Sequence, residues 1–251
     1  MFNLQEDGRR VILTLDHAPV NAINDEWLSR FHDLLDVLSK RDLVVLHIRS
    51  SQKVFCAGMD LEHVRHLFAL PDGANAMVED VGKFQQLFAC IEAMPFVVMA
   101  EIGGAALGGG LELALACDLR VASRRAKLGL PEAKLGLIPG AGGTQRLTKL
   151  CGRGIASRII LSGDVIDGAT AERLGIVQWA VEPDRLEAEA EAIATRVAGL
   201  SPDAVREAKS LIAAAGDVTR DGYTEEREAD RILFDTAEAR KRIGQFLEGA
   251  R

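Results

Sequence analysis

The feature that most restricts the fold of this sequence is a glycine-rich loop between an apolar run and a helix-forming segment. Phe96–Ile102 has the composition of a buried strand, Gly103–Gly110 is the loop, and Leu111–Ala116 is predicted to be helical. Similar elements alternate along the chain, with strands expected at 11–16, 43–48, 119–122 and 127–130 and helices at about 25–40, from residue 60, and at 75–93. This alternation predicts an α/β fold.

The composition of the chain changes near Pro183. From there to the end Ala, Glu, Arg and Leu dominate, with Pro202 and Gly216 as breaks. We therefore expect a core over residues 1–182 and a helical region over residues 183–251. The 251 residues, of which 48% are hydrophobic, supply enough apolar material for one large domain with such an appendage.

Charge and hydropathy argue against several classes of protein. The 30 basic and 37 acidic residues give a formal net charge of -7, whereas a nucleic-acid binder usually carries a basic face. The longest apolar stretch, Pro95–Leu119, is interrupted by two glutamates and by glycines, so it makes a poor membrane span. The first ten residues lack the apolar core of a signal peptide, and the four cysteines form no CxxC pair. We expect a cytoplasmic protein with no nucleic acid, membrane or structural zinc.

The glycine loop does not match a nucleotide-binding motif. A P-loop requires a lysine, and the sequence has no Lys or Arg between Glu101 and Arg120. A G-x-G-x-x-G pattern from Gly108 requires glycine at the position of Leu113. Consecutive glycines at a helix start instead leave N–H groups open to a ligand oxygen, which would make half of an oxyanion hole. Close packing of the helix on a sheet explains the glycines equally well.

A second turn of small residues, Cys56–Asp60, also follows an apolar run and precedes a helix, so it is a candidate for the second N–H donor. Two carboxylates lie near such turns. Glu112 is in the first turn of its helix, where an acidic residue also complements the helix dipole, and Glu132 follows Pro131 in a segment where it could be solvated. Placed together beside the donors, one carboxylate could protonate carbon while the other activates water.

Three other groupings have weaker support. Asp60, His63 and His66 fall on one face of a helix, but a metal site there would lack a further strong ligand. Cys56 has no evident histidine partner, which favours a buried thiol over a nucleophile. Gly140–Gly143 resembles an anion-binding nest, although we expect the tight start of a helix there.

Three longer motifs are more specific together than any single loop. They are Phe-Cys-Ala-Gly-Met-Asp at 55–60, Ala-Leu-Gly-Gly-Gly-Leu-Glu-Leu at 106–113 with Cys-Asp at 117–118, and Leu-Pro-Glu at 130–132 leading to Gly-Leu-Ile-Pro-Gly-Ala-Gly-Gly-Thr-Gln-Arg-Leu at 136–147. They resemble motifs of the crotonase superfamily, the enoyl-CoA hydratases and isomerases, over about residues 11–178 and more loosely to 248. The resemblance implies a spiral of ββα units with a helical C-terminal region that builds homotrimers, often paired into hexamers.

The resemblance also implies a substrate and a set of site residues. Family members hold the carbonyl of a coenzyme A thioester with two main-chain N–H groups, which match Met59 and Gly109. Glu132 would exchange a proton at the α-carbon, and Glu112 would activate the water that adds to the β-carbon. Coenzyme A is part of the substrate, and no separate cofactor is implied. Further substrate-binding residues would be Pro19, Val20, Ala22, Ala57, Gly58, Asp60 and Pro131.

Among the reactions of this family, the resemblance favours hydration of a trans-2-enoyl-CoA, because the isomerases tend to keep only the later glutamate. Segments 111–121 and 126–130 look most like methylglutaconyl-CoA hydratases, which indicates a branched substrate. Met59 stands where alanine is frequent and would narrow the acyl pocket, the turn at 17–21 is short, and residues 246–251 lack the family's lysine-rich tail. An enoyl-CoA isomerase, an acyl-CoA decarboxylase and a non-catalytic acyl-CoA-binding scaffold are the alternatives.

Overall fold

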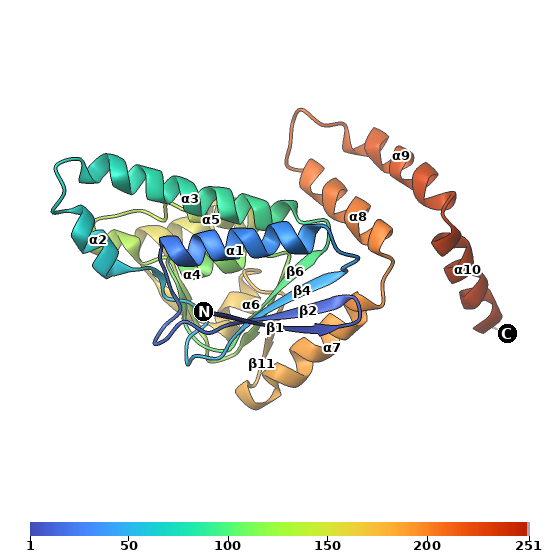
Figure 1. Cartoon of the computed structure of the whole chain (residues 1–251), viewed down its shortest axis with the longest axis horizontal. Helices are drawn as coiled ribbons and strands as arrows, with labels where there is room; N and C mark the ends of the chain where they lie inside the picture. The colour runs from blue at the N-terminus through green and yellow to red at the C-terminus, as the bar shows by residue number, and fades with distance from the viewer. Residues whose placement is uncertain (250–251) are drawn as a thin grey trace.

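A repeating order of elements organises the computed structural model, which describes residues 1–249 (Figure 1). Each repeat supplies one strand to a large sheet, then a short strand to a second layer, then a helix. The repeats are β2 (Arg10–Leu15), β3 (Ala22–Ile23) and α1 (Asp25–Ser39); β4 (Val45–Ser50), β5 (Gly58–Met59), α2 (Leu61–Leu67) and α3 (Gly73–Ala93); β6 (Val97–Ile102), β7 (Ala106–Leu107) and α4 (Gly109–Ala116); and β8 (Leu119–Ser123), β9 (Lys127–Gly129), the 3-10 helix η1 (Glu132–Leu135) and α5 (Gly143–Leu161).

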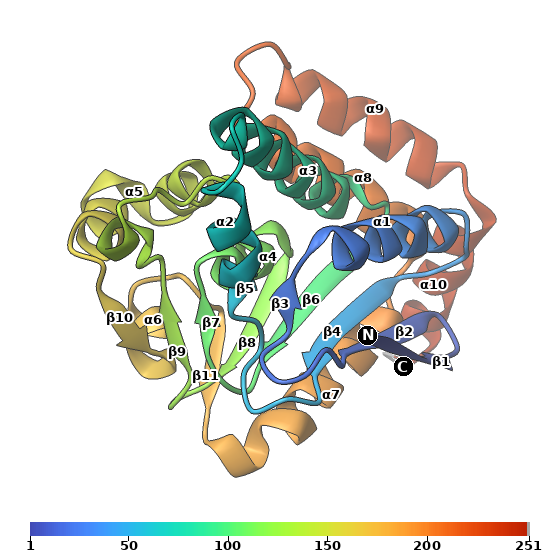
Figure 2. The ribbon, with the colours of Figure 1, turned by 60° about the vertical axis from the view of Figure 1, so that its left-hand side comes forward.

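The strands of both layers follow one another in chain order. The large sheet has the order β1-β2-β4-β6-β8-β11, in which β1 (Phe2–Asp7) is antiparallel to β2 and the other neighbours, out to β11 (Trp179–Val181), are parallel. In the second layer β3 pairs with β5, Cys56 bridges to Ala106, and β7 pairs with β9 (Figure 2). On its other side β9 pairs with β10 (Val165–Asp167) in antiparallel fashion. The chain therefore advances one strand per repeat, and the predicted α/β spiral is confirmed.

The large sheet is covered on both faces. On one face α1, α3 and α4 pack over residues such as Leu46 and Ile48, and on the other α7 (Leu186–Ala198) packs over Val45 (Figure 1). The helix α1 begins where the sequence predicts, because the Asn24 side chain accepts a hydrogen bond from the Trp27 N–H at 2.9 Å. Strands buried on both faces explain why their sequences are continuous apolar runs.

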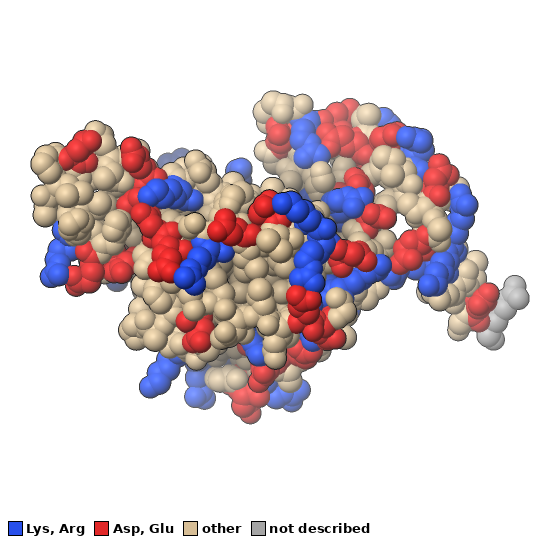
Figure 3. Space-filling view, in the orientation of Figure 1, with Lys and Arg blue, Asp and Glu red and all other residues tan. Residues whose placement is uncertain are grey.

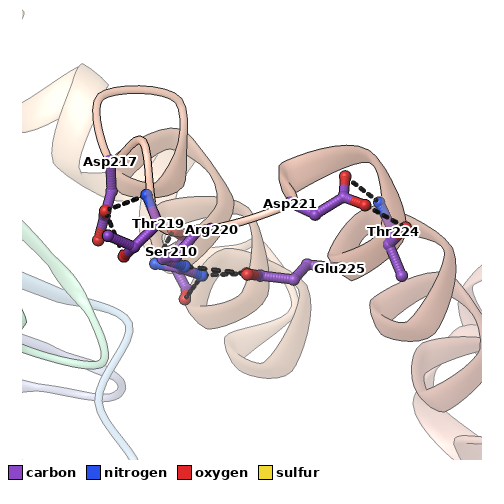
Figure 4. A network of polar contacts seen from close by, with 7 residues as sticks. All are labelled: Ser210, Asp217, Thr219, Arg220, Asp221, Thr224 and Glu225. Atoms are coloured by element: carbon purple, nitrogen blue, oxygen red, sulfur yellow. Dashed lines mark hydrogen bonds and ion pairs between the residues drawn. The ribbon is translucent and has the colours of Figure 1, made fainter.

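The helical segment after Pro183 has two parts. After η2 (Pro183–Arg185), α7 belongs to the packing of the sheet, whereas α8 (Pro202–Ala214), α9 (Gly222–Phe234) and α10 (Ala237–Gly249) extend away from it (Figure 1). Lys209 joins α8 to the core, with its Nζ 2.7 Å from the Asp118 carboxylate. Between α8 and α9, Arg220 pairs with Glu225 and donates to Ser210, which fixes the turn (Figure 4).

Charged groups of both signs alternate over the face in view, and the left-hand end, where α2 and the start of α3 lie, is largely uncharged (Figure 3). In the part of the chain that the structure describes, none of the helices combines the length and the hydrophobicity needed to cross a bilayer. The short helix α6 (Gly168–Arg173) completes the set of elements.

Candidate active site

Close packing places the start of α4 directly against the turn that precedes β5. A Cβ atom on Gly110 would lie 2.0 Å from the Cys56 carbonyl oxygen, so only glycine allows this approach. Gly108 has a φ of 54°, a conformation that side chains disfavour. The two explanations for the glycines are therefore compatible, because the same close packing that requires them brings the two candidate donor segments together.

The main-chain nitrogens of Met59 and Gly109 lie at this contact. A Cβ atom added to Gly58 would lie 2.7 Å from the Gly109 nitrogen. A Cβ atom added to Gly109 would lie 3.3 Å from the Met59 nitrogen, so the two segments are in close contact. Gly109 is the first residue of α4, so its N–H has no acceptor within the helix. The next N–H after Met59, that of Asp60, donates to Ile23 of β3 at 3.0 Å, so the Met59 N–H points away from β3.

Glu112 lies in the first turn of α4 and is only 2% exposed. Its Oε1 accepts a hydrogen bond from the Gly143 N–H at 2.7 Å, at the start of α5. The Gly140–Gly143 segment thus binds a carboxyl group supplied by the protein itself, a pairing that sequence reasoning did not find. The pKa of Glu112 is raised to about 7, mainly because burial disfavours the ionised form. The hydrogen bond from the Gly143 N–H opposes this rise, and the nearby Glu132 carboxylate adds to it.

Glu132 begins η1 and is half-buried. Burial raises the pKa of its carboxyl group above the ordinary value. Its Oε2 is buried and has no hydrogen-bond partner among residues 1–249, while its Oε1 lies 2.9 Å from where a Cβ on Gly108 would stand. A buried carboxyl oxygen without a partner is costly in a folded protein, and such groups concentrate at functional sites.

A single cavity of about 230 Å³ brings Met59, Gly109, Glu112 and Glu132 together. The rest of its wall is mostly apolar and includes side chains of α2, α3, η1 and the loop after η1, namely Leu61, Val64, Met77, Val81, Phe84, Leu135, Leu137 and Ile138. An apolar wall excludes water, which strengthens every hydrogen bond to a charge that develops inside. The arrangement can stabilise an oxyanion and move protons at the neighbouring carbons.

Some of the other predicted substrate-binding residues line the cavity, and the rest lie outside its lining. Ala57 and Pro131 line the cavity, and Gly58 forms the contact with Gly109. Asp60 caps α2, accepting from the Glu62 N–H at 2.9 Å, and does not line the cavity. The turn with Pro19, Val20 and Ala22 also lies outside the lining, although Ala22 pairs with Gly58 in the second layer.

The rival groupings have other roles in the structure. Burial raises the pKa of the Cys56 thiol to about 12, and its Sγ donates to the Asn21 carbonyl oxygen, so it is protonated at neutral pH. His63 pairs with Asp80 of α3, with Nε2 and Oδ2 2.6 Å apart. Within residues 1–249, no three His, Cys, Asp or Glu side chains are grouped so that they could hold a metal ion.

The buried Glu112 predicts a pH-dependent stability. Its pKa of about 7 in the folded state exceeds the ordinary value of 4.5, so the stability that this group contributes below pH 4.5 is lost as the pH rises through 7. Between pH 4.5 and pH 7, the free energy of unfolding falls by about 1.4 kcal/mol per pH unit because of this group. Glu112→Gln, which keeps an acceptor for Gly143, is therefore expected to unfold at higher urea concentration than the wild type above pH 7. The difference should vanish near pH 4.5, and a more stable wild type above pH 7 would contradict this account.

Comparisons with known proteins identify relatives that match nearly the whole chain. The family model described as enoyl-CoA hydratase/isomerase matches residues 9–250. A crotonyl-CoA hydratase of Syntrophomonas wolfei is 35% identical over 251 residues, which cover 98% of this chain and 94% of that protein. A structure of DspI from Pseudomonas aeruginosa is 38% identical with a TM-score of 0.90, covering 99% of this chain and 94% of that one. A crystal structure of an enoyl-CoA hydratase from Bacillus anthracis is 31% identical with a TM-score of 0.91, covering 99% of this chain and 96% of that one.

Sequence similarity over nearly the whole chain, together with the same spiral of ββα units, leads to one conclusion: this protein is an enzyme of the enoyl-CoA hydratase/isomerase family, within the crotonase superfamily.

Proposed function

We propose that this enzyme is a hydratase that adds water syn across the double bond of a trans-2-enoyl-CoA. The observation that carries the proposal is that two carboxyl groups, those of the buried Glu112 and the half-buried Glu132, line one apolar cavity together with Met59 and Gly109. An isomerase needs one group to move a proton between carbons, whereas hydration uses one group for water and another for carbon.

The roles follow from the placement of these groups. The thioester oxygen accepts hydrogen bonds from Met59 and Gly109, which stabilise the enolate as it forms. The ionised Glu112 takes a proton from a water molecule while the water oxygen bonds to the β-carbon. The carboxyl group of Glu132 enters this step protonated and gives its proton to the α-carbon. Proton exchange with solvent then returns both carboxyl groups to their starting states.

The wall of the cavity favours an uncharged acyl group. Apart from the two glutamates, the lining residues that the structure describes include no Asp, Glu, Lys, Arg or His. The acyl group of methylglutaconyl-CoA ends in a free carboxylate, which would meet two acidic groups and no cation there. Burial of an unpaired charge is strongly unfavourable, so we assign an apolar enoyl chain in preference to that substrate.

Incubation with crotonyl-CoA tests the function. We expect loss of the absorbance of the conjugated thioester and incorporation of solvent oxygen into a 3-hydroxyacyl product. Double-bond isomerisation or decarboxylation would yield products without solvent oxygen. Binding of acyl-CoA without turnover across a panel of thioesters would instead indicate a non-catalytic scaffold.

We further propose a cytoplasmic homotrimer, or a hexamer of two trimers, that needs no cofactor beyond the coenzyme A of its substrate. The projecting helices α8 to α10 leave large apolar side chains exposed, including Ile212, Ile232, Phe234, Ile243 and Phe246. Such a surface is typical of an interface between subunits. Sedimentation at three or six times the 27.1 kDa mass of the chain would support the assembly, and a monomer would contradict it.

A further inference from the structure

Arg120 is a buried arginine at the end of α4 that is remote from the active-site cavity. It lies on β8 and is only 3% exposed. Its Nη1 donates to the carbonyl oxygens of Ala114, at 3.2 Å, and of Cys117, and its Nε donates to that of Ile176 at 2.8 Å. None of these four residues lines the cavity. The guanidinium therefore joins the C-terminal end of α4 to the loop before β11.

This arrangement buries a cation without an acidic partner. No carboxylate within residues 1–249 forms an ion pair with Arg120, and the nearby Asp118 instead binds Lys209 and the Val98 N–H. Burial of a charge is costly unless other groups compensate it. The last carbonyl groups of a helix have no partner within the helix and form the negative end of its dipole. The last turn of α4 contains no basic residue, so Arg120 supplies the compensating charge from outside the helix.

We propose that Arg120 is a positioning residue for the reaction, which fixes the far end of α4 so that Gly109 and Glu112 keep their places at the near end. The inference rests on the proposed function in assigning roles to these two residues. A helix of eight residues is about 12 Å long, so a tilt at one end displaces the other. The contact of Gly110 with Cys56 holds the start of α4, and Arg120 holds its end. A helix that is held at both ends cannot pivot.

The strand that carries Arg120 gives this contact a rigid base. In the large sheet β8 lies between β6 and β11, and Arg120 is opposite Ala100 of β6. On the other side, the Arg120 N–H donates to Oε1 of Gln178 at 2.8 Å, and the Gln178 N–H donates to the Arg120 carbonyl oxygen at 3.1 Å. A guanidinium is planar and donates hydrogen bonds in fixed directions. It therefore specifies where the end of α4 lies relative to the sheet.

A second buried arginine provides a matched control. Arg10 of β2 is 5% exposed, and its guanidinium pairs with Asp7 and with Glu191 of α7. Replacement of either arginine removes hydrogen bonds of a buried side chain, so both changes should lower the free energy of unfolding. Only the loss of Arg120 should change the reaction, because only Arg120 contacts α4. The comparison separates positioning of the reacting groups from support of the fold.

Replacement of Arg120 by methionine tests the proposal. Methionine fills much of the space but donates no hydrogen bonds, so α4 is released at its far end. A displacement of about 1 Å at the reacting groups costs about 10²-fold in rate, so we expect kcat for crotonyl-CoA hydration to fall by about that factor while KM changes little. Arg10→Met should keep the wild-type kcat, although it should unfold at lower urea concentration.

Arg120→Lys is a milder variant that keeps the charge. Lysine lacks the planar fork that reaches several carbonyl groups at once, so its kcat should lie between those of the wild type and Arg120→Met. Circular dichroism establishes which variants fold. A wild-type kcat in folded Arg120→Met, or in folded Arg120→Lys if the methionine variant does not fold, would overturn the proposal. An equal fall of kcat in Arg10→Met would overturn it too.

The infrared carbonyl stretch of a bound thioester reports on the N–H groups without turnover. Butyryl-CoA, isotopically labelled at its thioester carbonyl, should absorb at lower frequency when bound to the wild type, because hydrogen bonds polarise the carbonyl group. We expect a smaller shift in Arg120→Met and the wild-type shift in Arg10→Met. If crotonyl-CoA were not hydrated but Arg120→Met reduced the shift, the hydratase assignment would fail and the positioning role would stand. If crotonyl-CoA were hydrated but Arg120→Met changed neither kcat nor the shift, the positioning role would fail and the hydratase would stand.

Discussion

Glu132→Gln is expected to lower kcat for crotonyl-CoA hydration by about 10²–10⁴-fold, the range for removal of a positioned acid or base. Glutamine preserves the size and shape of the side chain but has no proton to give to the α-carbon. The half-buried carboxyl lines the same cavity as Met59 and Gly109, so its loss affects the reacting end of the substrate. Stopped-flow measurement of absorbance loss gives the chemical step directly.

The matched control for this variant is Glu79→Gln, an exposed position on α3 that is outside the cavity. It should retain wild-type kcat. Deuterium uptake at the α-carbon of the product provides a second readout, which should fall together with hydration in Glu132→Gln. If Glu132→Gln kept kcat within tenfold of the wild type, another group would have to supply the proton.

Gly110→Ala is expected to lower kcat by about 10²–10³-fold, as removal of one oxyanion-hole donor does. The added Cβ would lie 2.0 Å from the Cys56 carbonyl oxygen, which is main chain and cannot rotate away. The start of α4 must therefore move away from the turn that carries Met59, which would separate the N–H groups of Met59 and Gly109 that we propose to bind the thioester oxygen. A displacement of about 1 Å at a reacting group is enough to cost 10²-fold in rate. Binding of a saturated acyl-CoA should weaken much less than catalysis.

Gly82→Ala is the control for adding a methyl group to a helical glycine. Gly82 lies within α3, and a Cβ there would meet nothing within 4 Å. This variant should keep full activity and gain up to about 1 kcal/mol in the free energy of unfolding. Circular dichroism and urea unfolding establish that Gly110→Ala is folded, and a folded Gly110→Ala enzyme with wild-type kcat would refute the role of this contact.

Most of the fold could be predicted because long elements carry their own periodic pattern. Trp27, Phe31 and Leu35 recur at helical spacing and are buried on one face of α1. The strand predicted at 11–16 is observed at Arg10–Leu15. The short strands of the second layer were not resolved as separate elements, since β3, β5 and β7 have two residues each and so carry no alternation. Their pairing depends on neighbours that are distant in the sequence.

The candidate site could be predicted only in part. The glycine loop and the two glutamates are visible as residue types, and the family resemblance suggested their roles. The Gly143 N–H that binds Glu112 comes from 31 residues away in the chain, and the apolar wall from α2 and α3 comes from a different repeat. The one available signal was the Gly140–Gly143 nest, which suggested an anion without indicating which one.

The sequence by itself determined where the longer helices and the strands β2, β4, β6, β8 and β9 run, because these elements depend mainly on residues that are adjacent in the chain. Whether only glycine is tolerated at Gly110 depends on its contact with the distant Cys56. Only the tertiary structure decided that Glu112 and Glu132 share one cavity and that Glu112 titrates near neutral pH. The physical reason is that burial is a property of the assembled molecule: a carboxyl group loses its water only when distant segments pack around it.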